Sequence, residues 1–175
     1  MHQAASEIRI RKAHQGDAQA IALIYNEGIR DRVATLETEE RTADERREWL
    51  TNRSDNHPVF VVERGGAIVA WGSLNPFNSR PAYRFVADFS VNVARTARGT
   101  GCGSLLLVHL IAAARELGFH KLVLAAFPWN EAGIRLYRKH GFRDVGIYHE
   151  QGLLDGRWVD TIIMELLLNN DSPPG

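Results

Sequence analysis

A β-patterned segment, a basic glycine-rich turn and an apolar helix follow one another over residues 91–106, and this run constrains the fold more than any other. Glycine permits tight turns and a close approach of the backbone to a ligand. The first amides of the following helix lack partners within it, and the helix dipole makes that end positive. Arg95 and Arg98 add positive charge. The run therefore predicts a binding site for a pyrophosphate.

Three kinds of phosphate site have such turns. A P-loop requires a lysine before its Ser or Thr, which the turn Gly101-Cys102-Gly103-Ser104 lacks. A Rossmann turn requires G-x-G-x-x-G and an acidic residue after the next strand, whereas here the glycines run G-x-G-x-G and Phe127-Pro128-Trp129 follows that strand. The remaining pattern, Arg98-x-x-Gly101-x-Gly103, resembles the pyrophosphate loop of the GNAT N-acetyltransferases, which use acetyl-CoA. An ordinary tight turn is the alternative.

Length and composition predict one globular domain over residues 1–175, with a core at 7–168 and flexible tails at 1–6 and 169–175. Equal numbers of basic and acidic residues, 21 of each, predict neither a nucleic-acid nor an anionic-membrane partner. No apolar run approaches the ~20 residues of a membrane span. The lone Cys102 and the absence of a signal-like start indicate the cytoplasm.

Hydrophobic periodicity predicts an α/β fold of order β-α-α-β-β-β-α-β-α-β-β: a mixed, mostly antiparallel sheet of about seven strands with helices on both faces. Asp17 is predicted to cap the first helix, and Thr42 and Glu45 form a capping box for the second. The predicted strands are 8–11, 59–64, 67–74, 85–93, 121–126, 142–153 and 158–168, and the predicted helices are 18–29, 42–50, 101–117 and 130–139.

Composition also predicts whether two of the helices are buried or exposed to solvent. The nearly all-apolar helix 101–117 is predicted to be buried. In the second helix and the segment before it, Arg41, Arg46 and Arg47 interleave with glutamates, which predicts a solvated face.

A second motif strengthens the resemblance to the GNAT family. Residues 130–142, Asn-Glu-Ala-Gly-Ile-Arg-Leu-Tyr-Arg-Lys-His-Gly-Phe, resemble the family signature N-x-x-A-x-x-L-Y-x-K-x-G-F. The resemblance implies that Asn130 bonds the pantetheine arm and that Tyr137 protonates the departing thiolate. Packing of Tyr137 between helix and sheet is the alternative.

Five further segments carry a narrower resemblance over residues 8–168: Ile24-Tyr25-Asn26-Glu27-Gly28-Ile29, Thr35-Leu36-Glu37-Thr38-Glu39, Arg80-Pro81-Ala82-Tyr83, Phe119-His120-Lys121-Leu122-Val123 and Leu154-Asp155-Gly156-Arg157-Trp158-Val159-Asp160. With these segments the chain resembles the phosphinothricin, methionine sulfoximine and arsinothricin N-acetyltransferases. This resemblance implies acetyl transfer to the α-amine of a small amino acid, and a homodimer.

The resemblance also implies where acetyl-CoA binds. The strand that ends at Val93 would hold the thioester carbonyl through backbone amides, and the turn would hold the pyrophosphate. The implied contacts are Phe89, Ser90, Val91, Val93, Arg98, Gly99, Thr100, Gly101, Cys102, Gly103, Ser104, Asn130 and Tyr137.

Transfer to an amine requires a base, because the lone pair of an ammonium group is occupied. Alternation along the strand 85–93 puts Asp88 on a polar stripe. The family commonly has glutamate at this position, so a water would span the missing methylene, and burial would raise the pKa of Asp88. Orientation of the backbone or of Arg84 is the alternative role.

An anionic acceptor requires a cation, and Arg80 is the leading candidate, with Tyr83 beside it. Leu36, Glu37 and Thr38 match a loop that closes over substrate in the family, where phenylalanine is common at position 36. For Trp158 and Asp160, core or strand-pairing roles are favoured over substrate contact.

Other chemistry is not predicted. The seven histidines lack metal-ligand spacing, and Cys102 has no neighbouring base, so neither a metal nor a cysteine nucleophile is expected. Two rival functions remain: acetylation of another amine, such as a protein N-terminus or a polyamine, and a CoA-binding module without turnover.

Overall fold

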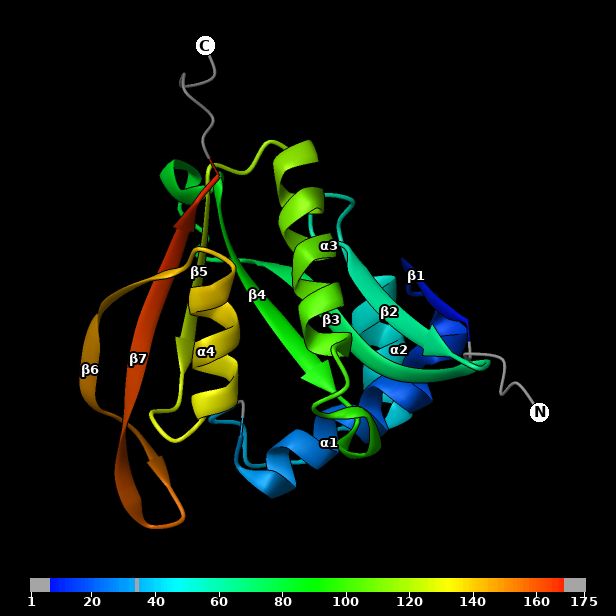
Figure 1. Ribbon diagram of the computed structural model, residues 1–175, viewed down its shortest axis with the longest axis horizontal. Helices are drawn as coiled ribbons and strands as arrows, with labels where there is room; N and C mark the ends of the chain where they lie inside the picture. Colours follow the sequence, from blue (N-terminus) through cyan, green and yellow to red (C-terminus); the bar gives the residue numbers. More distant parts are fainter. Residues whose placement is uncertain (1–6, 34, 169–175) are drawn as a thin grey trace.

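The computed structural model describes residues 7–33 and 35–168, so the tails predicted at 1–6 and 169–175 lie outside the described residues. Within this part of the chain, seven strands form one sheet of order β1-β2-β3-β4-β5-β7-β6 (Figure 1). Pairing is parallel between β4 and β5 and antiparallel elsewhere. The strands are β1 (Ile8–Lys12), β2 (Val59–Arg64), β3 (Ala67–Pro76), β4 (Val86–Val93), β5 (Lys121–Ala126), β6 (Arg143–Leu154) and β7 (Arg157–Leu167).

Helices cover both faces of this sheet, as predicted. The alternating apolar side chains of β2 show why. Phe60 and Val62 belong to the core cluster beneath α3 (Cys102–Glu116), whereas Val59 and Val61 pack with α1 (Ala18–Asp31). Successive side chains of a strand point to opposite faces, so one apolar strand supplies two cores. The remaining helices, α2 (Ala43–Thr51) and α4 (Glu131–Lys139), complete the two layers (Figure 1).

Most of these elements begin where local signals in the sequence predict. The capping box forms at α2: the Glu45 amide donates to Thr42 Oγ1 over 3.2 Å, and the Thr42 amide donates to the Glu45 carboxylate over 2.6 Å. Gly65 and Gly66 join β2 to β3 with positive φ values of 57° and 81°, which suits a two-residue hairpin turn.

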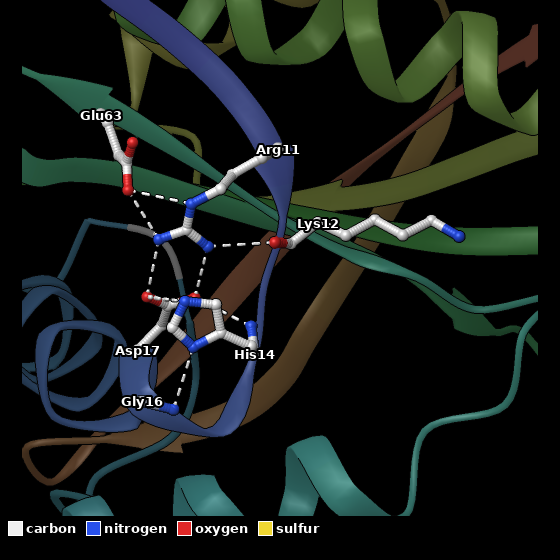
Figure 2. A network of polar contacts seen from close by, with 6 residues as sticks. All are labelled: Arg11, Lys12, His14, Gly16, Asp17 and Glu63. Carbon is white, nitrogen blue, oxygen red and sulfur yellow. Dashed lines mark hydrogen bonds and ion pairs between the residues drawn. The ribbon is translucent and has the colours of Figure 1, made fainter.

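Asp17 occupies the N-cap position of α1, but its side chain does not cap the helix as predicted. His14 begins a short 3₁₀ turn ahead of α1, and the buried Asp17 carboxylate accepts the His14 amide over 2.8 Å instead of capping α1 (Figure 2). The same carboxylate accepts two bonds from Arg11, whose guanidinium also bonds Glu63 on β2. Asp17 therefore joins the start of α1 to the sheet edge.

One prediction of burial is also corrected. Leu105 and Val108 of α3 are 42% and 51% exposed, so this helix is buried along one side and not all round. Of the two roles favoured for Trp158, the structure shows strand pairing: it pairs with Leu153 across β6 and β7 and, at 63% exposed, does not enter the core. Apolar composition alone does not separate a buried residue from one that a further surface would cover.

The sheet opens between β4 and β5, and this opening positions the site. The two strands pair over Val86 to Asp88 with Lys121 to Val123, and their pairing ends there. Figure 1 shows the strands diverging towards the start of α3. Beyond Asp88, β4 remains paired to β3 and β5 to β7, so β4 presents backbone groups to the opening.

Candidate active site

Asp88 lies at the point where the sheet opens. It is opposite Asn75 on β3 and Val123 on β5, the last pair of the parallel ladder. Burial raises its pKa to about 6, although a hydrogen bond from the Phe89 backbone opposes the rise. A carboxyl group with this pKa is mostly ionised at pH 7 and is a stronger base than an ordinary aspartate. The alternative role towards Arg84 is not seen, since Arg84 stacks on Phe85 and donates to Pro81.

Tyr137 faces the same point from α4. Its ring packs edge-on against Phe89 and Phe142, each with ring centroids 5.8 Å away. Burial raises the pKa of Tyr137 to about 12, and the negative charge of Asp88 contributes to the rise. The phenol therefore stays protonated at neutral pH and can donate a proton where Asp88 can accept one.

A cavity of about 410 Å³ surrounds Asp88 and Tyr137. Side chains from both helices of one layer and from the opened sheet form its walls, so segments far apart in the sequence meet there. The lining residues are Tyr25, Thr35, Leu36, Arg46, Trp49, Trp71, Ser73, Asn75, Asp88, Phe89, Ser90, Val91, Asn92, Leu124, Ala125, Ala126, Phe127, Asn130, Tyr137 and Thr161. We call this hollow the acceptor cavity.

A second hollow, of about 400 Å³, runs from the opening of the sheet to the start of α3. We call it the donor groove. It shares Val91, Asn92, Asn130 and Tyr137 with the acceptor cavity, so the two hollows meet beside Tyr137. The lining residues that the sequence predicted are Val91, Val93, Arg98, Gly99, Gly101, Gly103, Ser104, Asn130 and Tyr137.

The glycine-rich turn takes the conformation that its composition predicts. Gly99 and Gly101 have φ values of 74° and 87°, a region that side chains with a Cβ disfavour. Gly101 directly precedes α3 and has no capping side chain there, which leaves the first amides of the helix for a ligand. The side chains of Thr100 and Cys102 turn away: Thr100 Oγ1 donates to Ala97 over 2.5 Å, and Cys102 is 1% exposed.

The arginines of the turn are held by one carboxylate. Arg95 and Arg98 contact the two oxygens of Asp31, at the end of α1, over 2.7 and 2.6 Å. These bonds lower the pKa of Asp31 to about 2. The turn is thus fixed to α1, and part of the charge of Arg98 is neutralised within the protein.

Asn130 begins α4 at the boundary of the two hollows. Its side-chain oxygen accepts the Gly133 amide over 3.1 Å. A Cβ at Gly133 would lie 2.6 Å from Asn130 Nδ2, so the glycine makes this close cap possible. The cap fixes the asparagine at the start of the helix that carries Tyr137, about two turns before it.

The predicted acceptor residues are only partly brought together. Leu36 lines the acceptor cavity and contacts the backbone of β6 at Gly152. Glu37 pairs with Arg41, and Thr38 is exposed. Arg80 and Tyr83 lie in a separate hollow of about 340 Å³, where Tyr83 packs edge-on against Phe77. Within this chain, neither residue lines the cavity that holds Asp88.

Arg46 is the residue that sequence reasoning misses. The charge pattern places it on a solvated face, but it is 9% exposed and lines the acceptor cavity. Its neighbour Arg47 does lie at the surface, paired with Asp44. Trp49, three residues after Arg46, also lines the cavity, so a helical spacing of Arg and Trp in α2 was the available signal.

Two further classes of site are not found. Among residues 7–33 and 35–168, no cluster of three or more His, Cys, Asp or Glu side chains could hold a metal ion. In that same part of the chain, no helix has the length and apolar character required to cross a membrane.

A sheet opened beside a glycine-rich helix start, with an acid and a phenol at the opening, has the base and the proton donor that acyl transfer to an amine requires. The family model "Acetyltransferase (GNAT) family" matches residues 21–142. The chain belongs to this family and is an N-acetyltransferase.

Several relatives of this chain have names that state a more specific activity. The phosphinothricin N-acetyltransferase of Streptomyces coelicolor is 32% identical, over 89% of this chain and 94% of the relative. The L-methionine sulfoximine/L-methionine sulfone acetyltransferase of Salmonella typhimurium is also 32% identical, over 94% and 97%. A Sinorhizobium meliloti phosphinothricin acetyltransferase, solved in complex with acetyl-CoA, superposes with a TM-score of 0.89 at 29% identity, covering 96% of this chain and 93% of that one.

Proposed function

We propose that this enzyme transfers the acetyl group of acetyl-CoA to the α-amine of a small amino acid or analogue, such as phosphinothricin, methionine sulfoximine or arsinothricin. The observation that carries the proposal is the meeting of the donor groove with the acceptor cavity at Tyr137, with Asp88 in the wall of that same cavity. The named activities of the relatives support the acceptor class.

Acetyl-CoA supplies the activated acyl group, and the residues of the donor groove suit its parts. The amides from Arg98 to Gly103, at the positive end of α3, would hold the pyrophosphate. Asn130 would bond the pantetheine arm. Backbone amides of β4, from Phe89 to Val93, would hold the thioester carbonyl, because β5 no longer pairs with this part of the strand.

Asp88 and Tyr137 would then share the proton transfers. Asp88 takes one proton from the acceptor ammonium, directly or through a water, and the freed nitrogen lone pair forms the new C–N bond. As the C–S bond breaks, Tyr137 gives its phenolic proton to the sulfur, and the second proton that the nitrogen loses in becoming an amide returns to the tyrosinate oxygen, directly or through a water. The raised pKa of each group suits its role, since Asp88 becomes a stronger base and Tyr137 remains a proton donor.

The shape of the acceptor cavity supports a small acceptor. Its volume of about 410 Å³ suits an amino acid, and Leu36 closes one wall against β6. Glu37 and Thr38 continue this loop. Arg80 and Tyr83 remain proposed contacts, since Phe77 of their loop borders a hollow that also includes Asp88.

The test is release of CoA thiol from acetyl-CoA with a panel of amines. The panel holds phosphinothricin, methionine sulfoximine, arsinothricin, common amino acids, polyamines and short peptides. We expect turnover with the small amino acids and analogues. Turnover confined to peptides or polyamines would overturn the acceptor assignment, and saturable CoA binding without turnover of any amine would leave a binding module.

We also propose that the enzyme is a cytoplasmic homodimer. Val145, Ile147, Tyr148, Leu153 and Trp158, on β6 and β7, are each more than half exposed, and such an apolar surface favours burial against another chain. Light scattering after size exclusion tests this. We expect twice the mass of one chain, and a single-chain mass at micromolar concentration would refute the dimer.

A further inference from the structure

Arg46 is a buried cation surrounded by aromatic rings. Its guanidinium carbon lies 4.2 Å from the centroid of Tyr25, 5.0 Å from that of Trp49 and 5.9 Å from that of Trp71. Such contacts stabilise a cation but leave its charge in place. Burial lowers the pKa of Arg46, although Tyr25 opposes this, and an arginine nevertheless stays charged at neutral pH.

This charge has no ion-pair partner among residues 7–33 and 35–168. The nearby carboxylates are committed elsewhere: Glu37 and Glu45 pair with Arg41, and Asp44 pairs with Arg47. A buried charge is costly unless it is paired. A structural arginine would be expected to have a partner, whereas a ligand-binding arginine gains its partner from the ligand.

Unpaired hydrogen-bond donors accompany the charge. Within the described residues, the buried side-chain atoms without partners are Arg46 Nε, Trp71 Nε1, Asn92 Nδ2 and Thr161 Oγ1, and all four residues line the acceptor cavity. The three nitrogens can only donate. Buried polar groups normally have partners, so this concentration indicates a missing group rich in acceptor oxygens.

The donors lie away from the position proposed for the acceptor amine. Trp71 and Asn92 are partners across β3 and β4. Asn92 is four residues beyond Asp88 on the same face of β4, about 13 Å along the strand. An α-carboxylate shares its carbon with the α-amine and so stays near Asp88. The end of the acceptor side chain extends further from the amine than the α-carboxylate does, so it is the anionic group that lies on the side of the donors.

We propose, building on the function proposed above, that Arg46, Trp71 and Asn92 bind the anionic group at the end of the acceptor side chain. The preferred acceptors are then amino acids with a carboxylate, phosphinate or arsinate group several bonds from the amine. Arg46 supplies the charge, and Trp71 and Asn92 supply directed hydrogen bonds.

The experiment compares Arg46→Met with Arg47→Gln, a control at the exposed neighbouring arginine. The acceptors are L-phosphinothricin and L-methionine, which share the α-amine and α-carboxylate but differ in side-chain charge. Arg46→Met should raise KM for phosphinothricin by about 10- to 100-fold and leave KM for methionine unchanged, since a hydrogen bond to a charged group contributes about 1.5–3 kcal/mol. Arg47→Gln should change neither KM.

An equal rise for both acceptors, or no rise for phosphinothricin, would overturn the proposal. Arg46→Lys, which keeps the charge, should recover part of the affinity, and circular dichroism checks that each variant is folded. Quenching of the Trp49 and Trp71 fluorescence by phosphinothricin tests binding without turnover. Loss of this quenching in Arg46→Met would support the subsite even if the wild type acetylates neither acceptor, a result that would refute only the proposed function.

Discussion

The donor groove and the acceptor cavity meet at Tyr137, but different parts of the chain supply their binding groups. The groove relies on backbone groups: the amides before and within the first turn of α3 and the opened edge of β4. The cavity relies on side chains from α1, α2 and β3, with Arg46 and Trp71 among them. A backbone site suits a ligand part that never changes, whereas a side-chain site can differ from one acceptor to another.

The largest expected effect lies at Asp88, the proposed base in the wall of the acceptor cavity. Asp88→Asn should lower kcat/KM by about 10²- to 10⁴-fold, because it removes the proposed base while preserving shape. In the wild type, kcat/KM should fall as pH drops below about 6, where Asp88 becomes protonated. Thiol-release assays from pH 5 to 9 measure both effects. Full activity of the variant at every pH would remove Asp88 from the mechanism.

The same substitution should stabilise the protein at neutral pH. The folded pKa of about 6 exceeds the ordinary value of 3.8, so the folded state holds its proton more tightly. Stability is therefore lost as pH rises from about 4 to 6, by up to about 3 kcal/mol. Asp88→Asn does not titrate, so in urea unfolding the variant should be more stable than the wild type at pH 7 and equally stable near pH 4. If the variant were more stable at every pH, the effect would come from packing and not from protonation of Asp88.

A smaller effect is expected from the donor groove. Gly101→Ala should lower the free energy of unfolding by about 1–2 kcal/mol, because alanine disfavours the φ of 87° that Gly101 adopts before α3. Gly118→Ala is a matched control, since Gly118 has a φ of 82° just beyond the other end of α3. Both variants should unfold at lower temperature. Gly101→Ala alone should also raise KM for acetyl-CoA. An equal KM in the two variants would show that the turn does not bind acetyl-CoA.

The sequence predicted the fold and the donor groove from local patterns. The hairpin at Gly65 and Gly66 and the helix after Gly101 each depend on neighbouring residues, so a single strand-turn-helix pattern was sufficient. The order of elements and the mixed sheet are confirmed. The roles assigned to the groove residues remain predictions, although the structure gathers most of them along one hollow.

The acceptor cavity could not be predicted in the same way, because its residues come from distant segments. Arg46 stands among charged neighbours that do face solvent, and only the packing of α2 against Tyr25 and Trp71 turns it inward. Asp17 shows the same limit: it has the residue type of a helix cap, but Arg11 and the His14 amide occupy its carboxylate. In both cases tertiary contacts overrode a local preference.

The place of Asp88 on the last rung of the β4–β5 ladder has a consequence for how this enzyme could diversify. Its main chain is anchored by neighbours on both sides, so the reacting carboxylate is held by the stiffest layer of the molecule. Three residues of the acceptor cavity, Tyr25, Arg46 and Trp49, sit on helices laid over that layer. New acceptors can thus be accommodated by exchanging these side chains of α1 and α2, with the reaction centre left untouched.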